Sequence, residues 1–279
     1  MRFGCHLSIR NGYLGAAQQA YAMNAGAFQY FPKNPRNLTV KDFSKEDAAR
    51  CKEFCLEKGL VSVSHSPYPT NLTPQNETKR EHVVQSLLND LEISEACGSL
   101  GVVVHFGKPV AQLTLLDCYR LMIDVLNEIL YIWEGDAKIL LENNAGIPGT
   151  MGTTLEEHVH VRNLCDYPEK IGFCLDTCHA FASGLWDGDN WRDLAEKGTD
   201  LGYFQELQVI HFNNSKYGTR EGKDRHAPIF GKGCIKEEQF DDLIQSTQAA
   251  GVPLILETPK EEMPHEKEIQ LLLRKWSQK

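Results

Sequence analysis

Histidine and carboxylate residues close six short apolar segments of this 279-residue chain. The six terminal residues are His65, His105, Glu142, Asp176, His211 and Glu257. A run such as Val102-Val103-Val104, directly before His105, is typical of a buried parallel strand. Imidazole and carboxylate groups are ligands that zinc accepts in proteins. Because each run ends on such a group, the pattern predicts one metal site assembled from several strand ends.

The spacing of these residues indicates the architecture that positions them. Successive members lie 34 to 46 residues apart, about the length of a strand, a helix and two loops. Two earlier apolar runs, 1–6 and 27–31, bring the number of expected strands to eight. The segments expected to be helical are 12–22, 44–58, 78–97, 113–133, 238–250 and 265–276. Ser44 and Asp47 form a capping pattern at the start of the second of these, and Gly59 follows as its stop.

Repeated alternation of strand and helix predicts an α/β fold, a single (β/α)8 TIM barrel over residues 1–279. Active sites of such barrels lie at the C-terminal face of the strands, where the six terminal residues are expected. An open, doubly wound sheet is the alternative architecture for the same pattern of elements.

Three further residues extend the set of ligands. His179 follows Asp176 by three positions, and Asp224 and His226 lie two apart, on one side of an extended segment. Five histidines and four carboxylates suit zinc or manganese, and a bridging carboxylate allows the set to hold three ions. The isolated histidines expected to be ordinary surface or core residues are His6, His82, His158, His160 and His265.

Composition limits the class of protein without deciding its partner. The net charge of -9 argues against nucleic acid, but three divalent cations would outweigh four carboxylates and make the site locally positive. Nine cysteines, an odd number, and the lack of a signal-peptide core favour reduced thiols in the cytoplasm. Cys174 and Cys178 lie beside ligands but are expected to pack. No apolar run is long enough to predict a membrane span.

Several motifs spread along the chain carry a specific resemblance. They are Gly4-Cys5-His6-Leu7-Ser8, Lys33-Asn34-Pro35-Arg36, Leu141-Glu142-Asn143-Asn144-Ala145-Gly146, Cys174-Leu175-Asp176-Thr177-Cys178-His179, His211-Phe212-Asn213-Asn214-Ser215-Lys216, Asp224-Arg225-His226 and Leu256-Glu257-Thr258-Pro259. With them the chain resembles the endonuclease IV family of abasic-site (AP) endonucleases, AP endonuclease family 2, within the xylose isomerase-like TIM barrels.

This resemblance implies a zinc-dependent hydrolase that cuts the phosphodiester 5' to an abasic site in duplex DNA. The products would be a 3'-hydroxyl and a 5'-deoxyribose phosphate, in base excision repair. It implies three Zn²⁺ per chain, with Mn²⁺ an alternative at one position. His65 and His105 would hold the first ion, and Glu142 would bridge it to a second that Asp176, His211 and Glu257 complete. His179, Asp224 and His226 would hold the third.

The resemblance also implies roles outside the metal set. Glu142 and Glu257 are the catalytic candidates, and the partner is damaged double-stranded DNA. Contact with that DNA is expected from Lys33, Arg36 and Tyr68, on loops at the ligand side of the barrel. We expect a cytoplasmic monomer with no membrane partner.

The chain departs from the family pattern at four places. Pro69 stands where leucine or isoleucine is usual, Leu38 where many members have tryptophan, and Asn214 where aspartate is usual. The loop 217–223 carries an extra Glu-Gly. These changes predict altered DNA affinity or lesion preference. Two other functions remain open: a sugar isomerase or epimerase on the same barrel, which needs only one or two metal ions, and a catalytically silent nucleic-acid-binding module.

Overall fold

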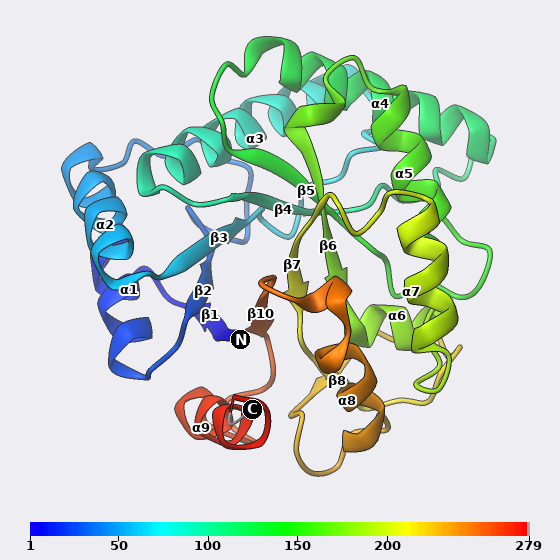
Figure 1. The fold of residues 1–279 in the computed structure, drawn as a ribbon. Helices are drawn as coiled ribbons and strands as arrows, with labels where there is room; N and C mark the ends of the chain where they lie inside the picture. The colour runs from blue at the N-terminus through cyan, green and yellow to red at the C-terminus, as the bar shows by residue number, and fades with distance from the viewer. Residues whose placement is uncertain (278–279) are drawn as a thin grey trace.

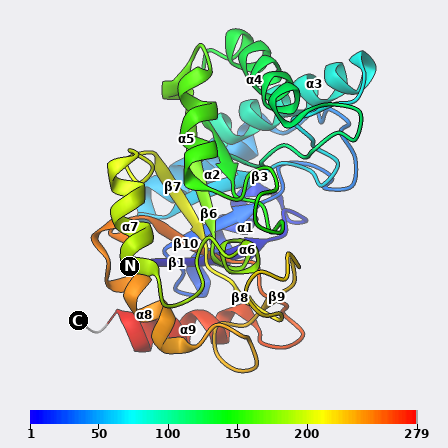
Figure 2. The ribbon, with the colours of Figure 1, turned by 90° about the vertical axis from the view of Figure 1, so that its right-hand side faces the viewer.

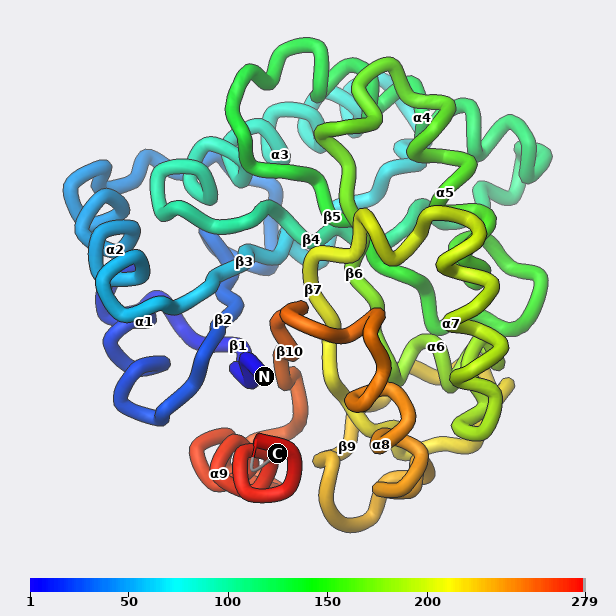
Figure 3. Tube along the Cα trace, viewed as in Figure 1, coloured from blue at the N-terminus to red at the C-terminus, as the bar shows by residue number. Residues whose placement is uncertain are grey.

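Eight parallel strands close into a barrel at the centre of the molecule (Figure 1). The computed structural model describes residues 1–277. The barrel strands are β1 (Arg2–Leu7), β2 (Ala27–Tyr30), β3 (Val61–His65), β4 (Gly101–His105), β5 (Lys138–Glu142), β6 (Ile171–Asp176), β7 (Leu207–His211) and β10 (Pro253–Leu256). β1 pairs with both β2 and β10, so the first and last strands meet and close the ring, as the trace in Figure 3 shows. The closed order confirms the TIM barrel and excludes the open sheet.

Helices surround this barrel on its outer side (Figure 1). They are α1 (Gly12–Ala22), α2 (Lys45–Lys58), α3 (Glu77–Cys97), α4 (Leu115–Ile132), α5 (Leu155–Leu164), α6 (Thr177–Ser183), α7 (Trp191–Asp200), α8 (Glu237–Gln245) and α9 (His265–Trp276). The predicted cap of α2 is confirmed, because the Asp47 backbone N–H donates to the Ser44 hydroxyl at 3.1 Å. Gly59 ends α2 with φ 66°, a left-handed conformation that glycine adopts without strain.

Some expected boundaries are wrong. The helix expected over 238–250 ends at Gln245, because Ser246 is extended and a short 3-10 turn follows. The last strand ends at Leu256, so Glu257 is the first residue of the following loop rather than a strand residue. α5, α6 and α7 lie outside the predicted helical segments. Across residues 1–277, no helix combines the length and the apolarity that crossing a membrane requires.

The barrel interior contains a small apolar layer of its own, separate from the larger core beneath the helices. This inner layer takes one residue from each of seven strands: Ala27, Val63, Val103, Leu140, Cys174, Val209 and Ile255. Side chains of a strand repeat their direction every second residue. The residue two positions further along the chain, which for β10 is the first loop residue, therefore also points inward, one layer nearer the C-terminal end of the barrel.

Candidate metal centre

The next layer of side chains, above the apolar layer, contains most of the residues that the sequence singled out. Two positions beyond its seven members lie Gln29, His65, His105, Glu142, Asp176, His211 and Glu257. The apolar layer closes the barrel beneath them, so their polar groups converge on one another and on the open end of the barrel. Strand periodicity thus brings six predicted ligands together with one residue, Gln29, that was not predicted.

Glu142, at the end of β5, lies at the middle of the cluster. One carboxylate oxygen, Oε2, lies 3.4 Å from His65 Nε2 and 3.3 Å from His105 Nε2. The other oxygen, Oε1, lies 3.0 Å from His211 Nδ1. The two oxygens therefore face two different groups of imidazoles, the arrangement needed for a carboxylate that bridges two ions.

The second group gathers on the opposite side of Glu142. His211 Nδ1 is 3.1 Å from Glu257 Oε2 and 3.8 Å from Asp176 Oδ2. Gln29, in the same layer, holds this group: its amide N–H donates to Glu257 Oε1 at 2.7 Å, and its Oε1 lies 2.7 Å from His211 Nε2. Ligand atoms of Glu142, Asp176, His211 and Glu257 all lie within 4.8 Å of one another.

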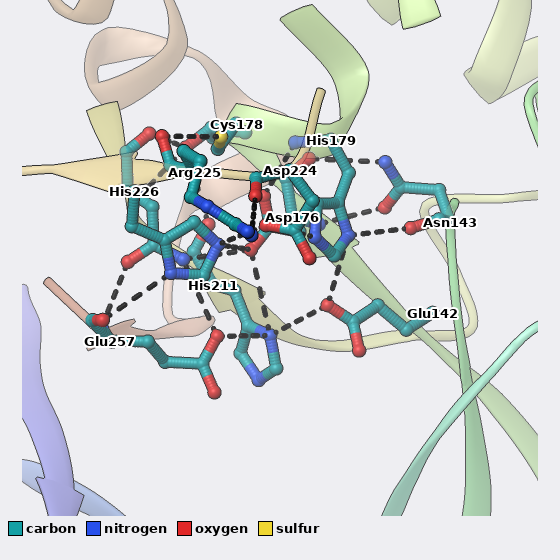
Figure 4. A network of polar contacts seen from close by, with 12 residues as sticks. Glu142, Asn143, Asp176, Cys178, His179, His211, Asp224, Arg225, His226 and Glu257 are labelled. Carbon is teal, nitrogen blue, oxygen red and sulfur yellow. Dashed lines mark hydrogen bonds and ion pairs between the residues drawn. The ribbon is translucent and has the colours of Figure 1, made fainter. Parts of the chain in front are cut away.

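The third group depends on segments outside the barrel. His179 lies in the first turn of α6, and His226 lies in β9 (His226–Ala227), which pairs with β8 (Asn214–Ser215). Figure 2 shows β8 and β9 on the side of the molecule away from the chain's N-terminus. Asp224 Oδ1 is 3.3 Å from His179 Nε2 and 3.4 Å from His226 Nε2 (Figure 4). Asp176 reaches this group too, 3.6 Å from His226 Nε2.

A metal ion fits the atoms that these residues leave free. Within residues 1–277, Glu142 Oε2, His179 Nε2 and His226 Nε2 are buried and have no hydrogen-bond partner. Unpartnered buried polar atoms are costly unless an ion or a water molecule satisfies them. All three atoms face the clusters, so the donor set fits a polynuclear centre.

The opposite ring nitrogens support the same conclusion. His65 Nδ1 lies 2.8 Å from the Ser66 carbonyl oxygen, and His179 Nδ1 lies 2.9 Å from the Asn143 carbonyl oxygen. A backbone carbonyl accepts a hydrogen bond from Nδ1–H, which keeps the proton on Nδ1 and leaves the lone pair of Nε2 for a metal ion. The rings are therefore oriented, and their tautomers set, by the chain itself.

The electrostatics of the cluster favour the metal-binding form at two of its central members, Glu142 and His105, whereas at His65, His179 and His211 neighbouring acidic groups outweigh burial and raise the imidazole pKa. Burial raises the pKa of Glu142, but the neighbouring imidazoles, that of His211 foremost, outweigh burial and leave the carboxyl pKa well below its ordinary value. Burial lowers the pKa of His105 to about 4, against the opposing effect of Glu142. At neutral pH, Glu142 is thus a carboxylate and His105 a neutral imidazole, the states that bind metal.

Cys174 and Cys178 lie near the ligands but differ from them chemically. Burial raises the pKa of each thiol to about 12, so neither is a thiolate at neutral pH. Cys174 belongs to the apolar layer inside the barrel. All nine cysteines lie in the described part of the chain and are unpaired, and Cys234 alone among them is exposed.

Asn143 and Asn213 brace the ligands and were not predicted. Asn143 Oδ1 accepts from the Asp176 backbone N–H at 2.7 Å. The Asn213 amide donates to Asp176 Oδ2 at 2.7 Å, and its oxygen accepts from the Glu257 backbone N–H at 2.8 Å. Their position in sequence, one and two residues after a ligand, is the signal that points to them.

The isolated histidines divide into three kinds. His82 and His160 are exposed, and His158 is buried in the core, as expected. His6 instead lies at the rim of the centre, with Nδ1 3.1 Å from the Gln29 amide. His265 is buried, with Nε2 2.8 Å from the Thr258 carbonyl oxygen.

A cavity of about 310 Å³ opens above the centre. Six of the nine predicted ligands line it, whereas Glu142, Asp176 and His211 lie beneath them and are at most 1% exposed. Tyr68 stands at the edge of the cavity, with 64% of its surface exposed. A ligand that enters the cavity thus meets the more exposed groups first, with the bridging carboxylate below.

The comparisons with known proteins agree with this geometry. A curated protein of Symbiobacterium thermophilum, named "Probable endonuclease 4", is 40% identical over 96% of this chain and 97% of its own length. The chain belongs to the endonuclease IV family. Residues 17–278 also match the sequence pattern of the xylose isomerase-like TIM barrel family. The resemblance inferred from the motifs is therefore confirmed.

Two further proteins extend the endonuclease IV comparison. The crystal structure of endonuclease IV from Thermus thermophilus is similar with a TM-score of 0.85, at 28% identity and 99% coverage of each chain. "Apurinic-apyrimidinic endonuclease 1" of Plasmodium falciparum is 29% identical over 99% of this chain, which spans 47% of that protein.

The loops expected to meet DNA in this endonuclease IV family member are held together. Tyr68, after β3, donates its backbone N–H to the Pro35 carbonyl at 2.9 Å, which ties it to the loop after β2. The Tyr68 ring packs edge-on against Phe31, with ring centroids 5.1 Å apart. Arg36 is exposed on the first of these loops. Both side chains are thus exposed, and Tyr68 also lines the cavity.

Lys33 requires a correction. Its ammonium group is not on the loop surface but inside the protein, 3.0 Å from Asp90 Oδ1 on α3 and 2.6 Å from the Ser86 carbonyl oxygen. The side chains of Lys33 and Asp90 are 1% and 0% exposed. A buried, paired ammonium group is out of reach of DNA, so Lys33 anchors the loop that carries Arg36.

The departures from the family pattern have different settings. Asn214 is buried and donates from its amide to the Ile235 carbonyl at 2.8 Å, which an ionised aspartate could not do. Leu38 is half-buried against the core, whereas Pro69 is exposed. Within the loop 217–223, Gly222 donates its backbone N–H to the Ala182 carbonyl of α6 at 3.0 Å, which fixes the segment leading to Asp224.

Proposed function

We propose that this protein is a metal-dependent AP endonuclease that hydrolyses the phosphodiester 5' to an abasic site in duplex DNA, in base excision repair. The observation that carries the proposal is the convergence of nine His, Asp and Glu ligands into three adjoining groups beneath one cavity. The names of the relatives, endonuclease 4 and apurinic-apyrimidinic endonuclease 1, support the choice of substrate.

Three ions, with zinc at each and manganese an alternative at one, match the donor set. His65, His105 and one oxygen of Glu142 form the first group, and the other oxygen faces Asp176, His211 and Glu257. His179, Asp224 and His226 form the third. When bound, such ions lower the pKa of a coordinated water toward about 7 and neutralise the charge of a phosphodiester.

The chain's own residues have distinct tasks in this scheme. Glu142 sets the separation of the first two groups, because its two oxygens face different imidazoles. Glu257 is fixed through both its oxygen and its backbone N–H, by Gln29 and Asn213. These two carboxylates are the catalytic candidates, and the site requires no serine or cysteine nucleophile.

Duplex DNA is the proposed partner, held at the rim of the cavity. Arg36 offers a cationic fork for a phosphate or the minor groove, and Tyr68 offers an aromatic wedge at a distorted base step. The products would be a 3'-hydroxyl and a 5'-deoxyribose phosphate. We further propose that the protein acts in the cytoplasm, as a monomer with one barrel domain.

Metal content and cleavage test this function together. Protein purified without chelator should hold close to three metal ions per chain, zinc dominant, and should cut a duplex with one abasic analogue on its 5' side. His179→Ala should lose metal and cleavage, whereas the exposed His160→Ala, a matched control, should keep both. One or two ions per chain with activity on sugars, and no DNA cleavage, would support the isomerase alternative instead.

A further inference from the structure

A buried carboxylate on the last helix joins the two segments that complete the exposed side of the metal centre. Glu268, in the first part of α9, is 0% exposed. Its Oε1 accepts from the Ile229 backbone N–H at 2.6 Å, and its Oε2 accepts from the Thr258 hydroxyl at 2.6 Å. Ile229 lies three residues after His226, and Thr258 directly follows Glu257.

These two segments need such a connection more than the barrel strands do. Glu257 lies beyond the end of β10, and His226 lies in a strand of two residues outside the barrel. His226 Nδ1 lies 3.3 Å from the Glu257 carbonyl oxygen, a long contact (Figure 4). His265, one turn before Glu268, adds a contact between its Nε2 and the Thr258 carbonyl oxygen. The start of α9 thus holds the Glu257 loop at two points.

The buried carboxyl group of Glu268 depends on its hydrogen bonds. Among residues 1–277, no lysine, arginine or histidine forms an ion pair with it. Burial raises its pKa, and the hydrogen bonds from Thr258 and Ile229 oppose that shift. A buried carboxylate without a cation is expensive, and its hydrogen bonds are what compensate it.

We infer that Glu268 is a positioning residue that holds His226 against Glu257 and thereby sets the affinity of the ion of the third group, His179, Asp224 and His226. We expect this ion to be the most weakly held, because the segments that carry its ligands lie outside the barrel. The inference rests on the proposed metal centre and adds a residue that touches no ion. Without the carboxylate, the Ile229 N–H is left buried and unpaired, so the segment carrying His226 moves to find another acceptor.

Two substitutions separate positioning from charge. Glu268→Ala removes both hydrogen bonds. Glu268→Gln keeps them, because the amide oxygen accepts from the Ile229 N–H while the amide nitrogen donates to the Thr258 hydroxyl oxygen. Leu272→Ala, one turn further along α9 and also fully buried, is the matched control for lost stability without lost hydrogen bonds.

Zinc competition with a chelator measures the dissociation constant of the weakest-bound ion in each variant, and hydrogen exchange follows the Ile229 amide. Glu268→Ala should raise the dissociation constant of that ion by about 10-fold or more and speed hydrogen exchange at the Ile229 amide. Glu268→Gln and Leu272→Ala should bind the ion with wild-type affinity. The inference would be overturned by wild-type metal affinity in Glu268→Ala. Affinity in Glu268→Gln as low as in the alanine variant, or an equal loss of affinity in Leu272→Ala, would overturn it as well. Wild-type cleavage of abasic duplex, measured alongside, judges the proposed function separately.

Discussion

Replacing Lys33 by methionine tests whether this lysine anchors the loop that carries Arg36 or contacts DNA itself. The Lys33 ammonium group lies 3.0 Å from Asp90 Oδ1, and neither side chain is more than 1% exposed. Burial raises the pKa of Asp90 to about 7, and the attraction of Lys33 lowers it only in part. Methionine keeps much of the volume of lysine but leaves Asp90 without its cation.

The expected loss of stability depends on pH, with a sign that the structure dictates. At pH 8 the variant must either bury an unpaired carboxylate or keep it protonated, and breaking a buried pair in this way costs about 3–5 kcal/mol. At pH 6, below the Asp90 pKa of about 7, most of this carboxyl group is protonated in the wild type, so the loss falls to about 1–3 kcal/mol, the contribution of a charged hydrogen bond to Ser86. The folded variant holds a proton that the unfolded chain releases, so its stability falls as pH rises.

Urea unfolding at pH 6 and pH 8 measures both values. Lys45→Met, at a side chain that is 82% exposed, is the control and should change stability little at either pH. Adding Asp90→Asn to Lys33→Met should remove most of the pH dependence that the stability of the single variant owes to this pair, because no titrating group remains at the two positions. Unchanged stability of Lys33→Met, together with weaker DNA binding and a lower salt dependence, would refute the anchor and restore Lys33 as a DNA contact.

Three further predictions concern the reaction and the DNA face. Glu142→Gln should keep binding of abasic duplex while cleavage, followed on a gel, slows about 10³-fold or more; wild-type cleavage would contradict its role. Arg36→Ala should weaken binding of abasic duplex by about 1–3 kcal/mol and lower the salt slope by about one, as a titration at several salt concentrations would show. Tyr68→Ala should lower the ratio of abasic to intact duplex binding at one fixed salt, and Pro69→Leu should raise it, because a slimmer, more flexible wedge enters the stack more easily. Equal ratios in the wild type, Tyr68→Ala and Pro69→Leu would mean that these loops do not distinguish abasic from intact duplex.

The metal centre itself is largely a consequence of local sequence. Leu140 and Glu142, or Val63 and His65, lie two apart on one strand, so burying the first inside the barrel points the second inward one layer higher. That relation needs no knowledge of distant contacts, which is why the strands, their number and the convergence of six candidate ligands could be predicted. The same rule applied to Ala27 would also have found Gln29.

Tertiary structure decided which of these groups share a site and which polar residues serve them. Glu142 faces two sets of imidazoles because β4, β5 and β7 meet in a closed ring, and the sequence contains only their order. Lys33 precedes Arg36 by three positions in one motif, yet one is buried and the other exposed, because α3 supplies Asp90 from more than fifty residues away. Glu268 serves the centre only because α9 packs beside segments that lie far from it along the chain. Burial and pairing depend on what the rest of the chain places around a residue, and no local pattern carries that information.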